Sequence, residues 1–262
     1  MTYYIPDGIV EIDKEWVKQN ISKDVTKVIC PSSLRIIGQC AFEHYSNLKE
    51  IELNERLEYI GRYAFDNSGI TSIQLPSSLK KIHDSVFSNC NKLRKIKLNE
   101  GLEYIYRFAF CNSGITSIQL PSSLKEIGDW AFSDCKQLNN IKLSEGLEYL
   151  DDNAFRNTEI INIQLPSSLK EIGDGAFRDC KYLKEVKLNE ELEHIGYSAF
   201  RNTEIINIII PNSLKEIEEN AFYDCKHLSE VIIGSKSPIA KFSEDKLKNI
   251  FGPYANIIIK DL

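Results

Sequence analysis

Apolar residues recur along most of this chain with a fixed spacing. From Pro31 to Ile233 the pattern L-x-x-I-x-x-x-A-F is followed by a short polar loop and then by L/I-x-x-I-x-L. A Pro-Ser-Ser-Leu or closely related segment opens every second copy, at 45-residue intervals, beginning at Pro31, Pro76, Pro121, Pro166 and Pro211. A fixed period of this size indicates a solenoid, in which each repeat packs only against its neighbours.

Each 45-residue unit contains two coils, one of 23 residues and one of 22. The shorter coil lacks one residue in its polar loop, as residues 156–165 show beside 133–143. Nine such coils fill residues 31–233, and we expect residues 1–30 and 234–262 to form degenerate caps on one domain. In the second cap, residues 243–251 predict a short helix that starts at Ser243, and residues 255–260 predict a last strand.

The spacing inside each coil predicts its local structure. The L/I-x-x-I-x-L segment alternates apolar and polar residues, as a strand does, and stacked copies would form a parallel sheet with strands about 4.8 Å apart. The L-x-x-I segment is too short for a helix and predicts a second strand or extended turn, with Ala-Phe in a helical turn after it. The phenylalanines at this position would form one buried column: Phe42, Phe65, Phe87, Phe110, Phe132, Phe155, Phe177, Phe200 and Phe222.

The full pattern I/L-P-x-S/G-L-x-x-I-G-x-x-A-F-x-x-C-x-x-L-x-x-I-x-L resembles the BspA-like, treponemal-type class of leucine-rich repeat. The resemblance covers residues 31–233. It implies a right-handed leucine-rich-repeat solenoid, mainly β, with a parallel sheet on its concave side. Many members are described as bacterial or protozoan surface proteins that bind host matrix proteins or other cells. The resemblance therefore implies a non-catalytic scaffold that binds proteins, with an adhesion role at the cell surface.

Two columns of outward residues accompany the L-x-x-I segments. The first alternates in charge from coil to coil and predicts a register device made of cross-strand pairs: Arg35, Glu58, Lys80, Glu103, Lys125, Glu148, Lys170, Glu193 and Lys215. The second contains Tyr59, Tyr104 and Tyr149, two coils apart. Tyrosines are favoured at interfaces, although packing over the neighbouring side chains explains them equally well.

The outward column of the expected concave sheet changes character along the chain. Lys97, Lys142 and Lys187 alternate with glutamines and then give way to Ile209 and Ile232. Ile161 and Ile206 also fall at outward positions. Clustered exposed apolar residues mark an interaction surface. The alternatives are that the C-terminal cap, with Ile239 and Phe242, folds over these isoleucines, or that the assumed register is wrong.

Composition narrows the choice of function. The net charge of −6 argues against nucleic acid, and no apolar run is long enough to span a membrane. No nucleophile, phosphate-binding or metal-ligand motif is present, so we expect no catalytic residues, cofactor or metal. Cys90, Cys135, Cys180 and Cys225 recur two coils apart, about 10 Å at the usual strand spacing, which is too far for disulfides.

The expected partner is a protein of unknown identity, bound on the concave sheet. Two other classes stay open: a self-assembling structural protein that uses its coil ends or C-terminal isoleucines, and a parallel β-helix enzyme acting on carbohydrate. The enzyme would need acidic or basic residues that converge on one strand face. The first twenty residues do not resemble a signal peptide, which favours the cytosol, whereas the family resemblance implies the cell surface or secretion.

Overall fold

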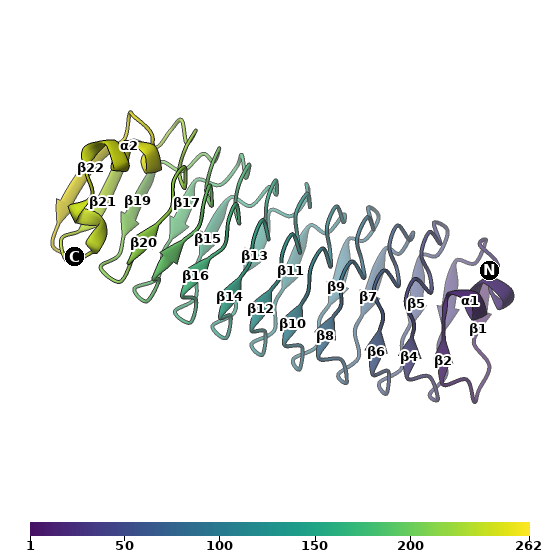
Figure 1. The fold of residues 1–262 in the computed structure, drawn as a ribbon. Coiled ribbons are helices and arrows are strands. Elements are labelled where there is room, and N and C mark those ends of the chain that lie inside the picture. The colour runs from purple at the N-terminus through teal and green to yellow at the C-terminus, as the bar shows by residue number, and fades with distance from the viewer.

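The computed structural model describes residues 1–262 and shows coils stacked along one axis, with the two chain termini at opposite ends (Figure 1). Every coil contributes two strands. The first set forms the odd-strand face: β3 (Lys27–Ile29), β5 (Glu50–Glu52), β7 (Ser72–Gln74), β9 (Lys95–Lys97), β11 (Ser117–Gln119), β13 (Asn140–Lys142), β15 (Asn162–Gln164), β17 (Glu185–Lys187), β19 (Asn207–Ile210) and β21 (Glu230–Gly234). The β1 strand (Thr2–Tyr4) and the β22 strand (Asn256–Lys260) complete this face at its two ends.

The L-x-x-I segments form the two-residue strands of the even-strand face: β2 (Glu11–Ile12), β4 (Ile36–Ile37), β6 (Tyr59–Ile60), β8 (Lys81–Ile82), β10 (Tyr104–Ile105), β12 (Glu126–Ile127), β14 (Tyr149–Leu150), β16 (Glu171–Ile172), β18 (His194–Ile195) and β20 (Glu216–Ile217). All strand pairs on both faces are parallel, and the pairings keep apolar residues in register, as Ile105 beside Ile127 shows. The predicted solenoid with parallel sheets is confirmed.

The Ala-Phe segments form a third side, which we call the turn face. In place of the expected helical turn, this side has successive hydrogen-bonded turns. A helix cannot continue here because every coil has two residues of positive φ: one stands directly before the Ala-Phe segment, and the other stands at the second position after the phenylalanine. Backbone N–H groups alternate in their partners: Ala131 N–H donates within its coil to Gly128, whereas Phe132 N–H donates 2.8 Å to Ala154 of the next coil. The turn face is therefore a third ladder between coils.

The phenylalanine column lies directly behind this ladder. All nine rings are fully buried, and successive ring centroids lie between 5.0 and 5.6 Å apart in stacked arrangements. Phe251 of the C-terminal helix stacks 5.4 Å from Phe222 and ends the column. The predicted phenylalanine core is confirmed.

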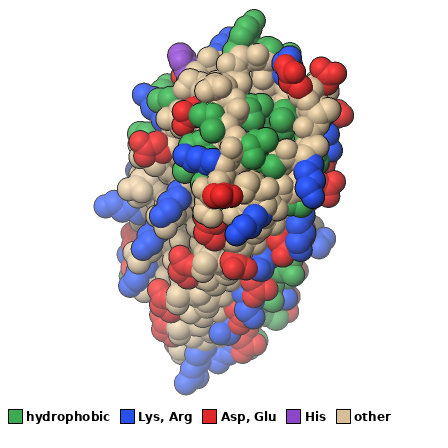
Figure 2. Space-filling view, turned by 90° about the vertical axis from the view of Figure 1, so that its left-hand side faces the viewer, with side chains coloured by type: hydrophobic (Ala, Val, Ile, Leu, Met, Phe, Trp, Pro, Cys, Tyr) green, Lys and Arg blue, Asp and Glu red, His purple; other side chains and the backbone are tan.

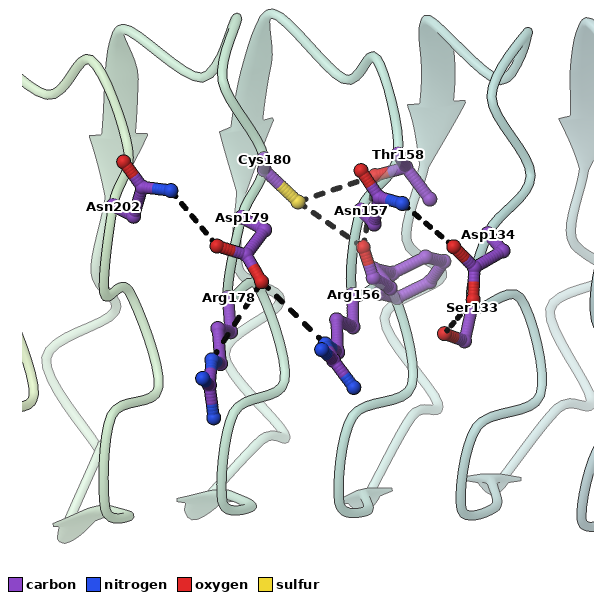
Figure 3. A network of polar contacts seen from close by, with 10 residues as sticks. Ser133, Asp134, Arg156, Asn157, Thr158, Arg178, Asp179, Cys180 and Asn202 are labelled. Atoms are coloured by element: carbon purple, nitrogen blue, oxygen red, sulfur yellow. Dashed lines mark hydrogen bonds and ion pairs between the residues drawn. The ribbon is translucent and has the colours of Figure 1, made fainter.

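Polar side chains form a second column on the turn face (Figure 3). Asn157 donates 2.6 Å to Asp134, and Asn202 donates 2.8 Å to Asp179. These positions have positive φ, which Asn and Asp tolerate better than other side chains. Deeper in the coil, the Cys180 thiol donates 3.1 Å to the Phe155 carbonyl. All seven cysteines are free, as the coil spacing predicts for the recurrent Cys90, Cys135, Cys180 and Cys225.

Two kinds of junction alternate along the stack, because 23-residue long coils (for example 121–143) alternate with 22-residue short coils (for example 144–165). From a short coil to the next long coil, the odd-strand face is paired, as between β15 and β17. From a long coil to the next short coil, pairing is absent between β9 and β11, β13 and β15, and β17 and β19. The fourth junction of this kind, between β5 and β7, keeps a single pair, Glu50 beside Ser72. Pairing is therefore weakened or lost wherever a long coil is followed by a coil whose loop lacks one residue.

Asparagine side chains hold most of these long-to-short junctions. The first residue of a short coil reaches back to the Pro-Ser-Ser-Leu turn of the long coil before it. Asn189 Nδ2 donates to the carbonyls of Pro166 (2.7 Å) and Leu169 (2.9 Å), and Asn54 and Asn99 make equivalent bonds. The junction between β13 and β15 has Ser144 instead, and its buried hydroxyl has no hydrogen-bond partner.

Dedicated elements close both ends. Helix α1 (Lys14–Asn20) begins at Asp13, whose carboxylate accepts from the Trp16 N–H, and it covers the N-terminal end with the β1 strand. Neither α1 nor β1 is evident from the repeat pattern. At the other end, the predicted helix and last strand are confirmed as α2 (Glu244–Phe251), capped by Ser243, and β22. A 3-10 helix, η1 (Pro238–Lys241), precedes them.

The phenylalanine column gives a first prediction. Phe132→Ala should lower the free energy of unfolding by about 3–5 kcal/mol, because a large buried ring leaves a cavity between two stacked neighbours. Urea denaturation measures the change. Phe108→Ala, on the surface of the turn face, is the control and should cost clearly less. Equal losses for the two variants would contradict the assigned core.

The serine junction gives a second prediction. Ser144→Asn should raise the free energy of unfolding by about 1–2 kcal/mol, because asparagine can donate two hydrogen bonds to the Pro-Ser-Ser-Leu turn as Asn189 does. The reverse change, Asn189→Ser, should lower stability by a similar amount. Unfolding midpoints in urea that move the other way, or not at all, would show that these side chains do not hold the junctions.

Candidate protein-binding surface

The outward residues of the odd-strand face form the surface that the sequence singles out. Lys97, Lys142 and Lys187 are all exposed at the ends of β9, β13 and β17. Each lies two strands from the next, with Gln119 and Gln164 on the strands between them. The three lysines therefore form an open row along the polar part of the face rather than a cluster.

Isoleucines replace this polar surface near the C-terminal end. Ile206 and Ile209 are 46% and 51% exposed, and Ile232 is half-buried. The pairing of β19, β21 and β22 places Ile209, Ile232 and Ile258 side by side on three neighbouring strands. We call Ile206, Ile209, Ile232 and Ile258 the isoleucine patch. Ile161 is equally exposed but lies two coils away, so it is separate from the patch.

The C-terminal cap does not cover the isoleucine patch. Ile239, Leu247, Ile250 and Phe251 are buried because the cap closes the end of the coil core. The interpretation that the cap folds over these isoleucines is therefore wrong. Ile258 was missed by the sequence pattern, because the cap helix interrupts the coil period just before β22 and removes the spacing that would have assigned it.

The unpaired junction between β17 and β19 opens a hollow beside the patch. Its volume is about 430 Å³. It is lined by five charged or polar residues and by four apolar ones: Lys184, Glu185, Lys187, Glu190, Asn207, Val186, Leu188, Ile206 and Ile209. Val186 points towards the core but is only partly buried. The missing strand pairing thus adds apolar depth to a surface that already has exposed isoleucines and a charged border.

The largest hollow of the odd-strand face lies at its other end, over β5, β7 and β9, with a volume of about 600 Å³. Its carboxylates have structural partners. Lys27 pairs with Glu50 (3.1 Å) and Glu52, and Glu55 accepts hydrogen bonds from the backbone N–H and hydroxyl of Ser77. These bonds from Ser77 lower the pKa of Glu55, which suits a permanently ionised group rather than a general acid.

The tyrosine column belongs to the even-strand face and differs from residue to residue. Tyr149 is 54% exposed, whereas Tyr59 packs 4.8 Å from the His83 ring. Tyr104 stacks on Tyr106, and the Lys81 ammonium lies over both rings. Packing thus accounts for Tyr59 and Tyr104, and all three tyrosines lie on a different face from the isoleucine patch.

The alternating charge column is paired at some junctions. Arg35 lies 3.7 Å from Glu58, Lys125 lies 3.4 Å from Glu103, and Lys215 pairs with Glu193. Lys170 instead pairs with Glu191, so the side chains do not follow the alternation throughout. Such exposed pairs contribute little stability each.

Comparison with known proteins decides the family. The model of the BspA-type leucine-rich repeat region matches the chain in six copies, over residues 11–124 and 103–229. The chain belongs to this family. No curated protein sequence matches it.

Several solved structures share the fold of this BspA-type repeat protein. A leucine-rich cell surface protein from Faecalibacterium prausnitzii is 19% identical, with a TM-score of 0.50, and the match covers 100% of this chain and 88% of the other. The pneumococcal vaccine antigen PcpA is 22% identical, with a TM-score of 0.57 and coverages of 100% and 89%. The leucine-rich repeat protein of T. pallidum is 21% identical, with a TM-score of 0.54 and coverages of 95% and 91%.

Side chains that could bind a metal ion or act as nucleophiles are dispersed along this BspA-type solenoid. No three His, Cys, Asp or Glu side chains are placed to share a metal ion. Burial raises the pKa of the Cys90 and Cys135 thiols to about 12, so they stay protonated inside the coils. Neither α-helix has the length or hydropathy that crossing a membrane requires.

An acidic cluster lies beside Tyr149 on the even-strand face. Burial raises the pKa of Asp151 to about 6, and the nearby charges of Glu126, Asp129 and Asp152 add to the shift. The folded state therefore binds a proton here more tightly than the unfolded state does. Protonation of Asp151 therefore stabilises the folded state. This contribution to the free energy of unfolding is complete below the ordinary pKa of 3.8 and is lost as the pH rises through the folded-state pKa of about 6.

This cluster gives a third prediction. Asp151→Asn should stabilise the protein at pH 8 by up to about 1 kcal/mol, a value reduced for solvent screening of a half-exposed group, and should have little effect at pH 4. Urea unfolding at both pH values tests this. Glu148→Gln, which removes an exposed carboxylate outside the cluster, should show no such pH dependence. A gain from Asp151→Asn that is equal at pH 4 and pH 8 would contradict the assignment.

Proposed function

We propose that this solenoid is a non-catalytic scaffold that binds a protein partner at the C-terminal end of its odd-strand face. The observation that carries the proposal is the isoleucine patch, four aliphatic side chains on a face whose other strands present mainly charged and polar side chains (Lys, Glu, Gln, Ser and Asn). Exposed apolar groups that gather in one place on a folded protein typically mark an interaction surface.

The surroundings of the patch suggest the chemistry of the partner. Lys184 and Lys187 border it on one side, and the hollow between β17 and β19 opens next to Ile206 and Ile209. Interfaces commonly have an apolar centre and a polar rim. Glu185 and Glu190 line the same hollow, so its rim carries both signs of charge. A partner with an apolar side chain for the hollow and charged groups of both signs around it would fit this arrangement.

A cell-surface role is part of the proposal. It is supported by the family to which the chain belongs and by the fold that it shares with a leucine-rich cell surface protein and with a vaccine antigen. These similarities are below 25% identity, so they support the shared fold, and the choice of partner depends on the residues of this chain.

The fourth prediction tests the patch. The double variant Ile209→Asp, Ile232→Asp should weaken partner binding by at least about tenfold, because it places two charges at the centre of an apolar contact. Both side chains point outward, so circular dichroism and the thermal midpoint should change little. Binding is measured by quantitative mass spectrometry of surface-protein extracts captured on the immobilised chain, and then by calorimetry with the captured protein.

A matched control separates the patch from the rest of the face. Ser117→Asp with Gln119→Asp places the same two charges on β11, at exposed positions of the same odd-strand face. The control should retain the captured protein that the isoleucine variant loses. Equal retention by both variants would move the site to the lysine row or to the exposed Tyr149.

A further inference from the structure

The two ends of the solenoid are closed on only part of their surface. At the C-terminal end, α2 continues the turn face, because Asn220 and Phe222 N–H groups donate to the Asn249 and Ile250 carbonyls of the helix. The η1 segment covers the end of the even-strand face, where Ser237 bonds to the Leu214 carbonyl and Ile239 is buried. On the odd-strand face, β22 is the outermost strand, and no segment of residues 1–262 pairs with its outer edge.

The outer edge of β22 is free for hydrogen bonding. Asn256 N–H donates to Ser229 and the Lys260 carbonyl accepts from Ser235, so residues 256, 258 and 260 face β21. In a parallel strand, the alternate residues Ile257 and Ile259 then point their N–H and C=O groups away from β21, and these groups have no backbone partner. An apolar edge strand of this kind is a template for a further strand.

The other end of the same face has a matching free edge. The Met1 carbonyl and the Ile5 N–H bond to the β3 side, so the backbone groups of Thr2 and Tyr4 point outward from β1. The direction and the alternation agree with those at β22. A second copy stacked end to end would bring its β1 beside β22, parallel to it, as every other strand of this face lies beside its predecessor.

Side-chain alternation is also consistent across such a junction. Ile257 and Ile259 pair with Val231 and Ile233, which point into the core, yet Ile259 is still 49% exposed because nothing stacks on β22. If β1 of a second copy paired with β22, its partly buried Tyr3 would lie next to the inward isoleucines of β22. Its outward Tyr4, which is 68% exposed in the single chain, would lie next to Ile258.

The charges and apolar groups of the two ends are complementary. Residues 1–26 contain five carboxylates and three lysines, whereas residues 235–262 contain five lysines and three carboxylates. Figure 2 looks onto the C-terminal end and shows hydrophobic side chains gathered there among charged ones. Two C-terminal ends would repel each other, so the charges favour contact between unlike ends.

We infer that this chain associates with copies of itself head to tail, with β22 of one copy pairing in parallel with β1 of the next. A contact between unlike ends does not close on itself, so the product is a linear chain of solenoids rather than a dimer. This assembly differs from the proposed partner site, because it uses the backbone edges of β22 and β1 and needs no outward side chain of β19 or β21. The two surfaces meet at Ile258, beside which Tyr4 of the next copy would lie.

The test uses proline at one free edge at a time. Ile259→Pro removes an outward N–H from β22, and Tyr4→Pro removes one from β1, while the bonds to β21 and β3 are kept. Sedimentation velocity over a concentration series should show that the parent chain grows beyond dimers and that each variant alone stays near its 30.0 kDa monomer mass. Circular dichroism and thermal midpoints confirm that both variants are folded.

Mixing the two variants is the decisive arm. The Tyr4→Pro chain has an intact β22 and the Ile259→Pro chain an intact β1, so an equimolar mixture should form a one-to-one dimer that grows no further. High salt should weaken this dimer, because it screens the charges of the two caps. The variant Ile209→Asp, Ile232→Asp should assemble like the parent, which separates this inference from the partner site.

Three results would overturn the inference. A parent chain that stays monomeric up to its solubility limit would do so, as would a mixture that stays monomeric although the parent assembles. A Tyr4→Pro variant that still dimerises alone would show a symmetric contact between two β22 edges instead.

Discussion

Hydrogen bonding between successive coils is the constraint on which the rest of this structure depends. A strand of two or three residues cannot pair with another strand of its own coil, so its N–H and C=O groups need the coils on either side. The same holds for the turn face, where alternate N–H groups donate to the next coil. Register is therefore set collectively. The phenylalanine column, the Asn–Asp ladder and the Cys–carbonyl bonds all repeat because one backbone spacing repeats.

This constraint also explains where the stack departs from uniformity. At the four junctions where a short coil follows a long one, the odd-strand face keeps one pair between β5 and β7 and none at the other three, whereas the even-strand face stays continuous from β8 to β20. Asparagine side chains bridge the same junctions at the Pro-Ser-Ser-Leu turns, and Asn157 and Asn202 do so on the turn face. The asparagine bonds thus compensate part of the lost strand pairing, and the unpaired junction between β17 and β19 leaves the hollow beside the isoleucine patch.

The sequence predicts the repeating part of the fold almost completely, because each coil meets nearly the same neighbours and its apolar spacing reports that environment directly. It predicts the ends less well. Strand β1 and helix α1 carry no repeat spacing, and Ile258 follows a helical insertion that destroys the coil count. The sequence also does not determine whether Ile206 and Ile209 are exposed, because their exposure depends on where the C-terminal cap packs. The cap occurs once in the chain, so the repeat spacing contains no information about its position.

The ends of a solenoid present an unavoidable conflict between closing the core and terminating a sheet. Helices α1 and α2 cover the ends of the core because their buried faces replace a missing coil and their backbone bonds are satisfied internally. Neither helix can satisfy the outward N–H and C=O groups of an edge strand, because those groups need another extended segment. Natural sheets commonly protect such edges with charge, proline or a bulge. Strand β22, with Ile257, Ile258 and Ile259 in its centre, has none of these within the strand except the terminal Lys260, and this unprotected edge is the physical basis of the assembly that we infer.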